Sequence, residues 1–100
     1  MHILLVEDHT QLVQTLTRSL GALGIRVEAC SDGRQADARL KQHAFDVVVL
    51  DLALPHLDGI EILRRLRERG DKVPVMFLTA SGDTWDRVQG VNAGPRANLP

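Results

Sequence analysis

Short, continuously apolar runs alternate along this chain with stretches in which apolar residues recur every three or four positions. Continuous runs are typical of parallel strands covered on both faces, and the wider spacing is typical of amphipathic helices. The expected strands are the continuous runs at residues 3–6, 47–50 and 75–78, together with residues 25–29, where apolar and polar residues alternate weakly. The expected helices are residues 12–23, 36–44, 60–66 and 84–91. Strict alternation predicts an α/β fold, a doubly wound parallel sheet with four strand-helix units and right-handed crossovers.

The end of the chain departs from this pattern. Residues 95–100 carry a proline at each end and only two apolar side chains, so they make a poor buried strand. One hundred residues, 44% of them hydrophobic, are enough for a single core and leave no room for a second domain. We therefore expect one domain over residues 1–94 and an irregular tail over residues 95–100.

The charge of the chain argues against a nucleic-acid-binding protein. The formal net charge is -1, so no overall positive field attracts phosphates, and we expect no direct DNA binding by this chain. Four arginines, Arg64, Arg65, Arg67 and Arg69, are interleaved with Glu61 and Glu68. This pattern favours a solvated helix face over a phosphate-binding patch.

The single cysteine and the lack of long apolar segments indicate a cytoplasmic protein. Cys30 has no partner for an internal disulfide, which fits a reducing compartment, and we expect it to be a small core residue. No apolar stretch approaches the roughly 20 residues that span a bilayer. The first residues lead directly into a strand-like run without the features of a signal peptide, so no membrane partner is expected.

Three carboxylates follow two of the expected strands. Glu7 and Asp8 come directly after residues 3–6, and Asp51 comes directly after residues 47–50. Ligands of doubly wound sheets bind outside the carboxyl ends of the strands, where these acids would meet. Neighbouring carboxylates raise the cost of ionising one another unless a cation or a proton lies among them. Their oxygen atoms suit Mg²⁺, which would bring phosphate oxygens to Asp51 and allow that carboxylate to act as a nucleophile.

A less specific interpretation exists for each of these residues. Taken singly, Glu7, Asp8 and Asp51 are compatible with helix caps or solvated loop acids, and only their shared edge favours a site. Asp58, which precedes a glycine, is expected to be a turn or cap residue. Thr79 follows the fourth strand and fits either a β-branched residue at the edge of the core or a phosphate contact.

Several motifs, in order along the chain, resemble the receiver domain of bacterial two-component response regulators, the CheY-like family. They are Leu5-Val6-Glu7-Asp8, Val48-Val49-Leu50-Asp51-Leu52-Ala53-Leu54-Pro55 with Asp58-Gly59, and Pro74-Val75-Met76-Phe77-Leu78-Thr79-Ala80. The similarity extends from Met1 to about Gly94 and is greatest to receivers attached to winged-helix DNA-binding domains. It implies a sheet of flavodoxin-like strand order.

The resemblance also implies roles for particular residues. Asp51 would accept phosphate from a partner sensor histidine kinase. Glu7, Asp8 and Asp51, with the backbone carbonyl of Ala53, would hold Mg²⁺. The hydroxyl of Thr79 would move toward the phosphoryl group as the switch. Proteins of this kind are signalling switches in transcriptional responses rather than metabolic enzymes.

The last residues depart from the family, which continues with a fifth strand carrying an aromatic residue and a Lys-Pro pair, and then a fifth helix. Lys41 and Lys72 lie in the wrong places to replace that lysine, and the guanidinium of Arg96 differs from an ammonium group in shape and hydration. We therefore expect impaired signalling. We also expect an exposed fourth-strand edge, lower stability, and self-association as a homodimer or strand-exchanged oligomer.

Two other functions compete with this interpretation. The first is an interaction module that docks a kinase or a sister regulator through its first helix, independently of phosphorylation. The second is a small Mg²⁺-dependent phosphohydrolase with Asp51 as its nucleophile. The second is disfavoured because no further catalytic acid follows Asp51 in the manner of those enzymes, and no cap closes a substrate pocket.

Overall fold

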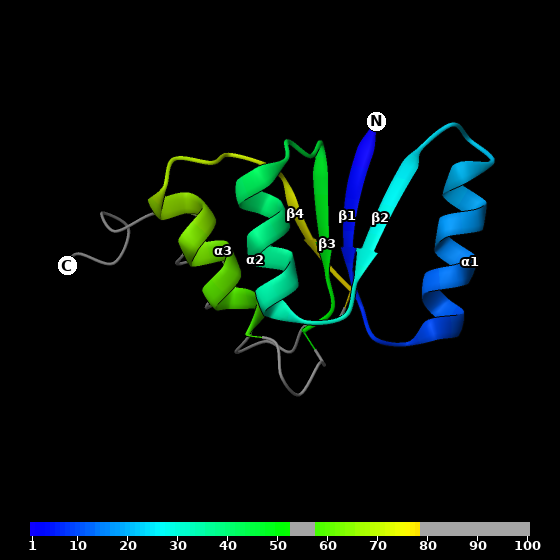
Figure 1. Ribbon diagram of the computed structural model, residues 1–100, viewed down its shortest axis with the longest axis horizontal. Helices are drawn as coiled ribbons and strands as arrows, with labels where there is room; N and C mark the ends of the chain where they lie inside the picture. The colour runs from blue at the N-terminus through cyan, green and yellow to red at the C-terminus, as the bar shows by residue number, and fades with distance from the viewer. Residues whose placement is uncertain (53–57, 79–100) are drawn as a thin grey trace.

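A computed structural model describes residues 1–52 and 58–78 of the chain, which form a parallel sheet with helices on both faces (Figure 1). The elements are β1 (His2–Val6), α1 (Thr10–Gly21), β2 (Arg26–Cys30), α2 (Gly33–Gln42), β3 (Val47–Leu50), α3 (Gly59–Glu68) and β4 (Val75–Phe77). The strand order is β2-β1-β3-β4, which confirms the doubly wound α/β prediction. The expected helix at residues 84–91 and the tail at residues 95–100 lie outside the described residues. None of the helices in the described ranges is long and apolar enough to cross a membrane.

Strand β1 lies at the centre of the sheet and is buried on both faces, as its continuous apolar run predicts. Its four apolar residues, 3–6, are at most 8% exposed. The prediction holds less well for β3, where Val48 and Leu50 are fully buried but Val47 and Val49 are only half-buried. One face of β3 is therefore covered and the other only partly.

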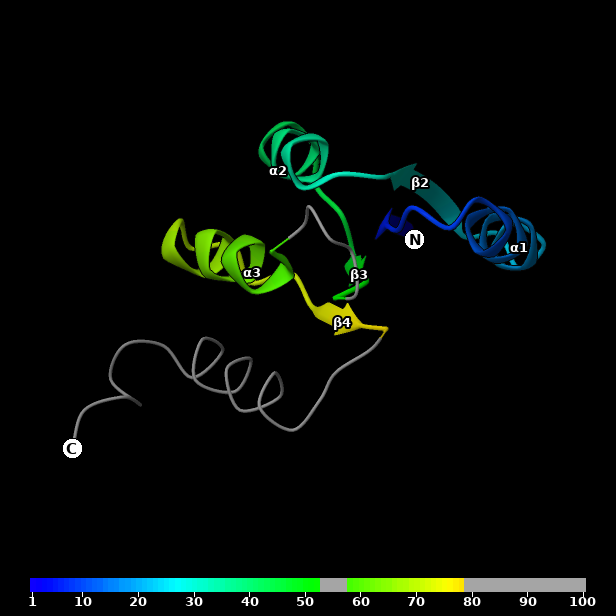
Figure 2. The same ribbon diagram turned by 90° about the horizontal axis from the view of Figure 1, so that it is seen from below.

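The covered face packs against α2 and α3, which lie on the same side of the sheet (Figure 2). The principal core consists of Leu4, Val6, Cys30, Ala36, Leu40, Val48, Leu50, Ile62, Leu66 and Val73. Cys30 is 8% exposed, which confirms the prediction that it is a core residue. Burial raises the pKa of its thiol to about 11, so it is not a reactive cysteine at neutral pH.

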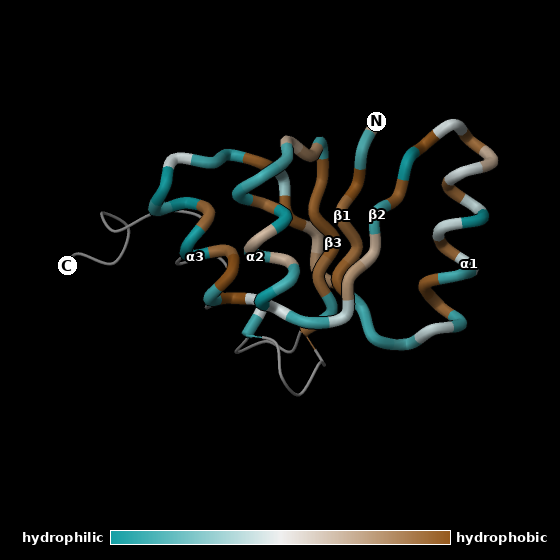
Figure 3. The backbone as a smooth tube through the Cα atoms, viewed as in Figure 1, coloured by the Kyte–Doolittle hydropathy of each residue, from teal (hydrophilic) through white to brown (hydrophobic). Residues whose placement is uncertain are grey.

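Helix α1 lies on the opposite side of the sheet, beside β2 (Figure 2), and none of its residues is buried. The predicted amphipathic helix is present, and Leu12 on it is 37% exposed. Leu23 lies beyond the end of the helix and is 76% exposed. Figure 3 shows continuous apolar segments along β1 and β3 and only interrupted ones along α1. The apolar side of α1 is only partly covered because this helix lies beside an outer strand of the sheet.

The helix boundaries follow local chemistry. Gly24 and Gly70 have φ angles of 81° and 82°, and they follow α1 and α3 as the sequence predicts. Helix α2 begins earlier than expected because the carboxylate of Asp32 accepts a hydrogen bond from the backbone N–H of Gln35 at 2.9 Å. It ends at Gln42, so the expectation that Ala44 belongs to it was wrong.

Asp58 is the N-cap of α3, as predicted, and Gly59 follows it at a point of close packing. Asp58 Oδ1 accepts hydrogen bonds from the backbone N–H groups of Ile60 at 3.1 Å and Glu61 at 3.2 Å. A Cβ atom on Gly59 would lie 2.7 Å from Cδ2 of Leu52. A side chain at position 59 would therefore force the Leu52 side chain, which follows Asp51, to shift.

We predict that Gly59→Ala lowers the free energy of unfolding by about 1–2 kcal/mol, because the Leu52 side chain must leave its position. Urea denaturation followed by circular dichroism would measure the loss. Gly21→Ala is the matched control, since nothing lies within 4 Å of a Cβ at that position. The control should be neutral or slightly stabilising. Equal destabilisation by both substitutions would contradict the packing argument.

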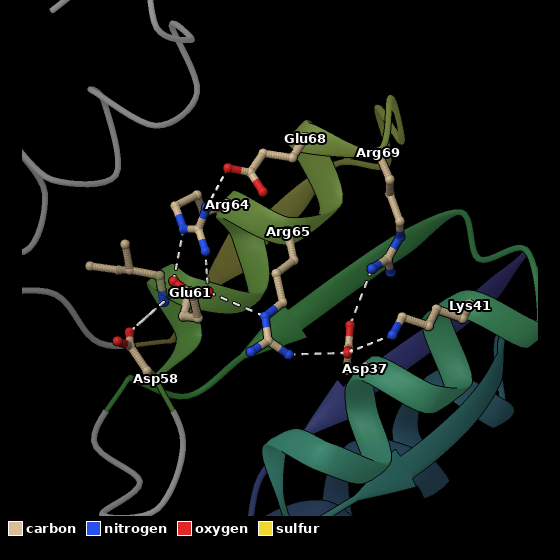
Figure 4. Close-up of polar contacts among 9 residues, drawn as sticks. Asp37, Lys41, Asp58, Glu61, Arg64, Arg65, Glu68 and Arg69 are labelled. Carbon is tan, nitrogen blue, oxygen red and sulfur yellow. Dashed lines mark hydrogen bonds and ion pairs between the residues drawn. The ribbon is translucent and has the colours of Figure 1, made fainter.

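Asp37 joins the two helices of the covered face (Figure 4). This α2 carboxylate is only 8% exposed and accepts hydrogen bonds from Arg69 Nη1 at 3.2 Å and Arg65 Nη1 at 3.3 Å. Lys41 Nζ lies 3.3 Å from its Oδ2. Burial raises the pKa of Asp37, but the hydrogen bonds from Arg69 and Lys41 outweigh this effect, and the net shift is downward. The ionised form is therefore the one that holds α2 and α3 together.

A carboxylate with a lowered pKa stabilises the fold above the ordinary aspartate pKa of about 3.9, and this contribution disappears as the pH falls through the folded-state pKa. We predict that Asp37→Asn is about 1–2 kcal/mol less stable than the parent chain at pH 7, and that the difference shrinks below pH 4. Urea denaturation across this pH range measures it. Glu68→Gln is the control, because Glu68 forms an exposed ion pair and should change stability by less than about 0.5 kcal/mol. A pH-independent difference for Asp37→Asn would contradict the electrostatic explanation.

Candidate functional site

The backbone hydrogen bonds of the sheet continue past the strand ends and place Glu7 beside Asp51. The N–H of Glu7 donates to the carbonyl of Cys30 at 3.0 Å, and the N–H of Asp51 donates to the carbonyl of Val6 at 3.1 Å. Because β1 and β3 are adjacent and parallel, the first residue after each strand lies at the same edge. The predicted meeting of Glu7 and Asp51 at the carboxyl edge is confirmed.

Glu7 is a buried carboxylate, only 4% exposed. Burial raises its pKa, and the adjacent Asp51 carboxyl raises the pKa further. A hydrogen bond from the backbone N–H of His9 to Glu7 Oε1 at 3.2 Å acts in the opposite direction without reversing the shift. The charged form of Glu7 is therefore unfavourable unless positive charge lies nearby.

The second oxygen of this carboxylate has no donor in the part of the chain that the structure describes. Glu7 Oε2 is buried and receives no hydrogen bond there. Two ionised carboxylates cannot hydrogen-bond to each other, so a buried Glu7 carboxylate beside Asp51 calls for either a shared proton or a cation. A buried oxygen without a donor normally lowers the free energy of unfolding by about 1–3 kcal/mol. This is a large cost for a carboxylate whose only role is to pack inside the domain.

Asp8 and His9 connect this acidic pair to α1. Asp8 is exposed, and its negative charge also raises the pKa of Glu7. His9 is the N-cap of α1, and its Nδ1 accepts a hydrogen bond from the N–H of Leu12 at 3.1 Å. The sequence interpretation overlooked His9 because the ordinary signals for a helix N-cap are Ser, Thr, Asp and Asn.

The structure brings together two of the three predicted carboxylates. Among residues 1–52 and 58–78, no three acidic, histidine or cysteine side chains converge as a metal site. Asp8 remains at the exposed rim of the site. Ala53 and Thr79, the other residues predicted for this site, lie outside the described residues. Glu7 and Asp51 still fit Mg²⁺, since that ion binds through one or two carboxylates and keeps several waters.

A parallel sheet of order β2-β1-β3-β4 with an acidic pair at its carboxyl edge defines a doubly wound domain of the CheY-like class. Comparison with family models gives a match to the response regulator receiver domain over residues 3–99. The chain belongs to this family, the receiver domains of two-component response regulators.

Curated relatives agree with this assignment. The transcriptional regulatory protein TctD of Salmonella typhimurium is 40% identical over 100 residues, which cover all of this chain and 45% of TctD. The response regulator MprA of Mycolicibacterium vanbaalenii is 41% identical over 100 residues and is covered to 43% of its length. The chain thus spans less than half the length of these relatives.

A solved structure supports the fold and bears on the metal. The receiver domain of the sensor histidine kinase PA1611 from Pseudomonas aeruginosa is 35% identical, with a TM-score of 0.74, and the match covers 86% of this chain and 72% of that one. That protein was crystallised with a magnesium ion coordinated in its active-site cleft.

Proposed function

We propose that this domain is a phosphoacceptor, in which Asp51 takes a phosphoryl group from a sensor histidine kinase with the help of Mg²⁺. The observation that carries the proposal is the pairing of Asp51 with the buried carboxylate of Glu7, whose second oxygen has no donor among the described residues. A bound cation would satisfy that oxygen and offset the repulsion within the pair.

In the proposed reaction, a carboxylate oxygen of Asp51 attacks the phosphorus of a phosphohistidine on the kinase. The new oxygen–phosphorus bond forms as the phosphorus–nitrogen bond breaks, and the imidazole leaves with the electron pair of that bond. Glu7 stays in place through the hydrogen bond from His9 and keeps a second negative group beside the nucleophile. Mg²⁺ held by Glu7, Asp8, Asp51 and the Ala53 carbonyl would supply the positive charge that the incoming phosphoryl oxygens need.

The phosphorylated carboxylate is a signal rather than a step of metabolic turnover. It adds negative charge and acceptor oxygens at the sheet edge, and the hydroxyl of Thr79 is the proposed group that responds to them. The relatives named above are called transcriptional or response regulators. We propose that the longer protein to which such a domain belongs uses this signal to control transcription.

Incubation of the protein with Mg²⁺ and a small phosphodonor or a histidine kinase tests the proposal. We expect an acid-stable, base-labile phosphate on the parent chain and none on Asp51→Asn. Asp46→Asn is the matched control, because Asp46 precedes β3 and so lies at the opposite end of the sheet. Loss of the label in both variants, or its retention in Asp51→Asn, would contradict the assignment of Asp51.

A second candidate function is docking through α1 without phosphorylation, favoured by the half-exposed apolar stripe of that helix. Absence of label on the parent chain, together with kinase binding that is lost in Leu12→Ser, would support this alternative. Leu23→Ser is its control, since Leu23 is exposed but lies beyond the helix. Label on Asp51 together with kinase binding unaffected by Leu12→Ser would exclude it.

A further inference from the structure

One residue, His9, joins the first turn of α1 to the buried carboxylate of Glu7. Its backbone N–H donates to Glu7 Oε1 at 3.2 Å. Its ring Nδ1 accepts a hydrogen bond from the N–H of Leu12 at 3.1 Å, and its carbonyl accepts one from the N–H of Val13 at 3.0 Å. Two of the three hydrogen bonds of His9 therefore belong to the helix, and the third belongs to the acidic pair.

The first turn of α1 depends on this cap more than the first turn of a buried helix would. No residue of α1 is buried, and Leu12 in the first turn is 37% exposed. The first turn also contains no acidic residue to stabilise the positive end of the helix. The N–H of Leu12 has no acceptor within the helix, so the ring of His9 supplies the one that it needs. Loss of the ring should therefore loosen the start of α1.

The same segment determines where two of the predicted metal ligands lie. Glu7 is 4% exposed, and the N–H of His9 is the donor that the described residues provide to its carboxylate. Because the helix fixes His9, this N–H keeps a constant direction toward Glu7. Asp8 lies between these two hydrogen-bonded residues. Fraying of the first turn would therefore release both the Glu7 carboxylate and the backbone of Asp8.

We propose that His9 is a positioning residue for the acidic pair: it keeps Glu7 in the orientation that binds a cation and couples this orientation to the first turn of α1. Hydrogen-bond partners of metal ligands orient those ligands, and their loss typically lowers metal affinity about 10- to 100-fold. This role rests on the proposed function, in which Mg²⁺ is the cation that Glu7 and Asp51 bind. By thermodynamic linkage, a cap that favours Mg²⁺ binding is itself stabilised by Mg²⁺.

Titration of the isotope-labelled full chain with Mg²⁺ at pH 8, followed by nitrogen–proton correlation spectra, tests the proposal. His9→Ala should weaken Mg²⁺ binding about three- to tenfold, because the N–H remains but loses its fixed direction. His9→Asn should restore most of the lost affinity, since asparagine is a strong N-cap residue. Leu20→Ala is the matched control, because it removes packing from the last turn of α1 and leaves the cap in place. It should change the affinity less than about twofold.

His9→Pro separates the effect of the N–H from that of the ring. The φ angle of His9 is -76°, which suits proline, and proline has no N–H. This variant loses the hydrogen bond to Glu7 as well as the cap, so it should weaken Mg²⁺ binding at least about tenfold. If circular dichroism shows that it does not fold, the comparison of His9→Ala with His9→Asn and Leu20→Ala still decides.

Hydrogen exchange of the Leu12 amide gives a second measurement, independent of phosphate transfer. Saturating Mg²⁺ should slow this exchange in the parent chain by the same factor by which the ring of His9 strengthens Mg²⁺ binding. In His9→Ala the amide has lost its acceptor, so Mg²⁺ should leave its exchange unchanged.

Several results would overturn the proposal. They are equal weakening of Mg²⁺ binding by His9→Ala and Leu20→Ala, full affinity in His9→Pro, and exchange at Leu12 that Mg²⁺ does not slow in the parent chain. Absence of Mg²⁺ binding by the parent chain would overturn it together with the proposed metal. Mg²⁺ binding without phosphate on Asp51 would instead contradict the phosphoacceptor function alone.

Discussion

Replacing Asp51 with asparagine is expected to stabilise the folded domain by about 1–2 kcal/mol in magnesium-free buffer, while it removes the capacity to take phosphate. The reason lies in the buried oxygen of Glu7, which has no donor in the described part of the chain, and in the repulsion from the adjacent Asp51 carboxyl. An asparagine amide removes one negative charge and offers N–H groups beside the Glu7 carboxylate. A gain in stability with loss of activity is typical of a strained functional site.

Urea denaturation in the presence of a chelator measures this gain. Asp46→Asn is again the control, because the Asp46 carboxylate accepts a hydrogen bond from the N–H of His2 at 2.6 Å and its replacement should not stabilise. Addition of Mg²⁺ should stabilise the parent chain and reduce the advantage of the variant. A variant less stable than the parent chain would show that Asp51 is a structural residue, and the argument from repulsion would then fail.

Leu4→Ala is expected to lower the free energy of unfolding by about 3–5 kcal/mol, a large part of the total stability of a domain of this size. Leu4 is fully buried in the central strand and belongs to the core cluster that contains residues of both α2 and α3. Its truncation removes apolar contacts and leaves a cavity, because strand β1 is held by hydrogen bonds to β2 and β3 and cannot move inward.

Leu23→Ala is the matched control for this effect. The same side chain is truncated, but Leu23 is 76% exposed, so the change in stability should stay within about 0.5 kcal/mol. Circular dichroism during urea denaturation gives both values. A loss below 1 kcal/mol for Leu4→Ala would mean that the face of the sheet against α2 and α3 is not the main core.

The sequence was most informative where a pattern repeats over a whole element. Residues 47–50 form β3 with the bounds that their apolar run predicts, and residues 3–6 are buried on both sides. The carboxyl-edge site could be predicted for a related reason. Residues directly after adjacent parallel strands must lie side by side, so the positions of Glu7 and Asp51 follow from the strand assignment.

The pattern was less informative where burial depends on distant partners. The spacing of apolar residues in α1 predicts an amphipathic helix, and that helix exists, but none of its residues is buried. Periodicity shows which face of a helix is apolar and says nothing about how much of the sheet lies beneath it. Val47 and Val49 illustrate the same limit on β3.

The arginines of α3 show most clearly what local sequence leaves open. Their alternation with glutamates predicts one solvated face, yet the structure gives them three different environments. Arg64 pairs with Glu61 and Glu68 on the same helix, and Arg67 donates to the backbone carbonyls of Asp71 at 3.0 Å and Val73 at 2.8 Å. Arg65 pairs with Glu61 on the same helix and also reaches across to Asp37 on α2, as does Arg69, the C-cap residue of α3.

The sequence by itself determined the order of elements, the class of the sheet and the edge at which the acids meet, because these depend on short-range periodicity and on chain direction. Only the tertiary structure decided that Glu7 is buried with an oxygen that lacks a donor among the described residues, and that Asp8 stays at the exposed rim. It alone showed that Asp37 of α2 pairs with Arg65 and Arg69 across the contact with α3. Burial and charge balance depend on which elements pack together, and that packing joins residues far apart in the chain.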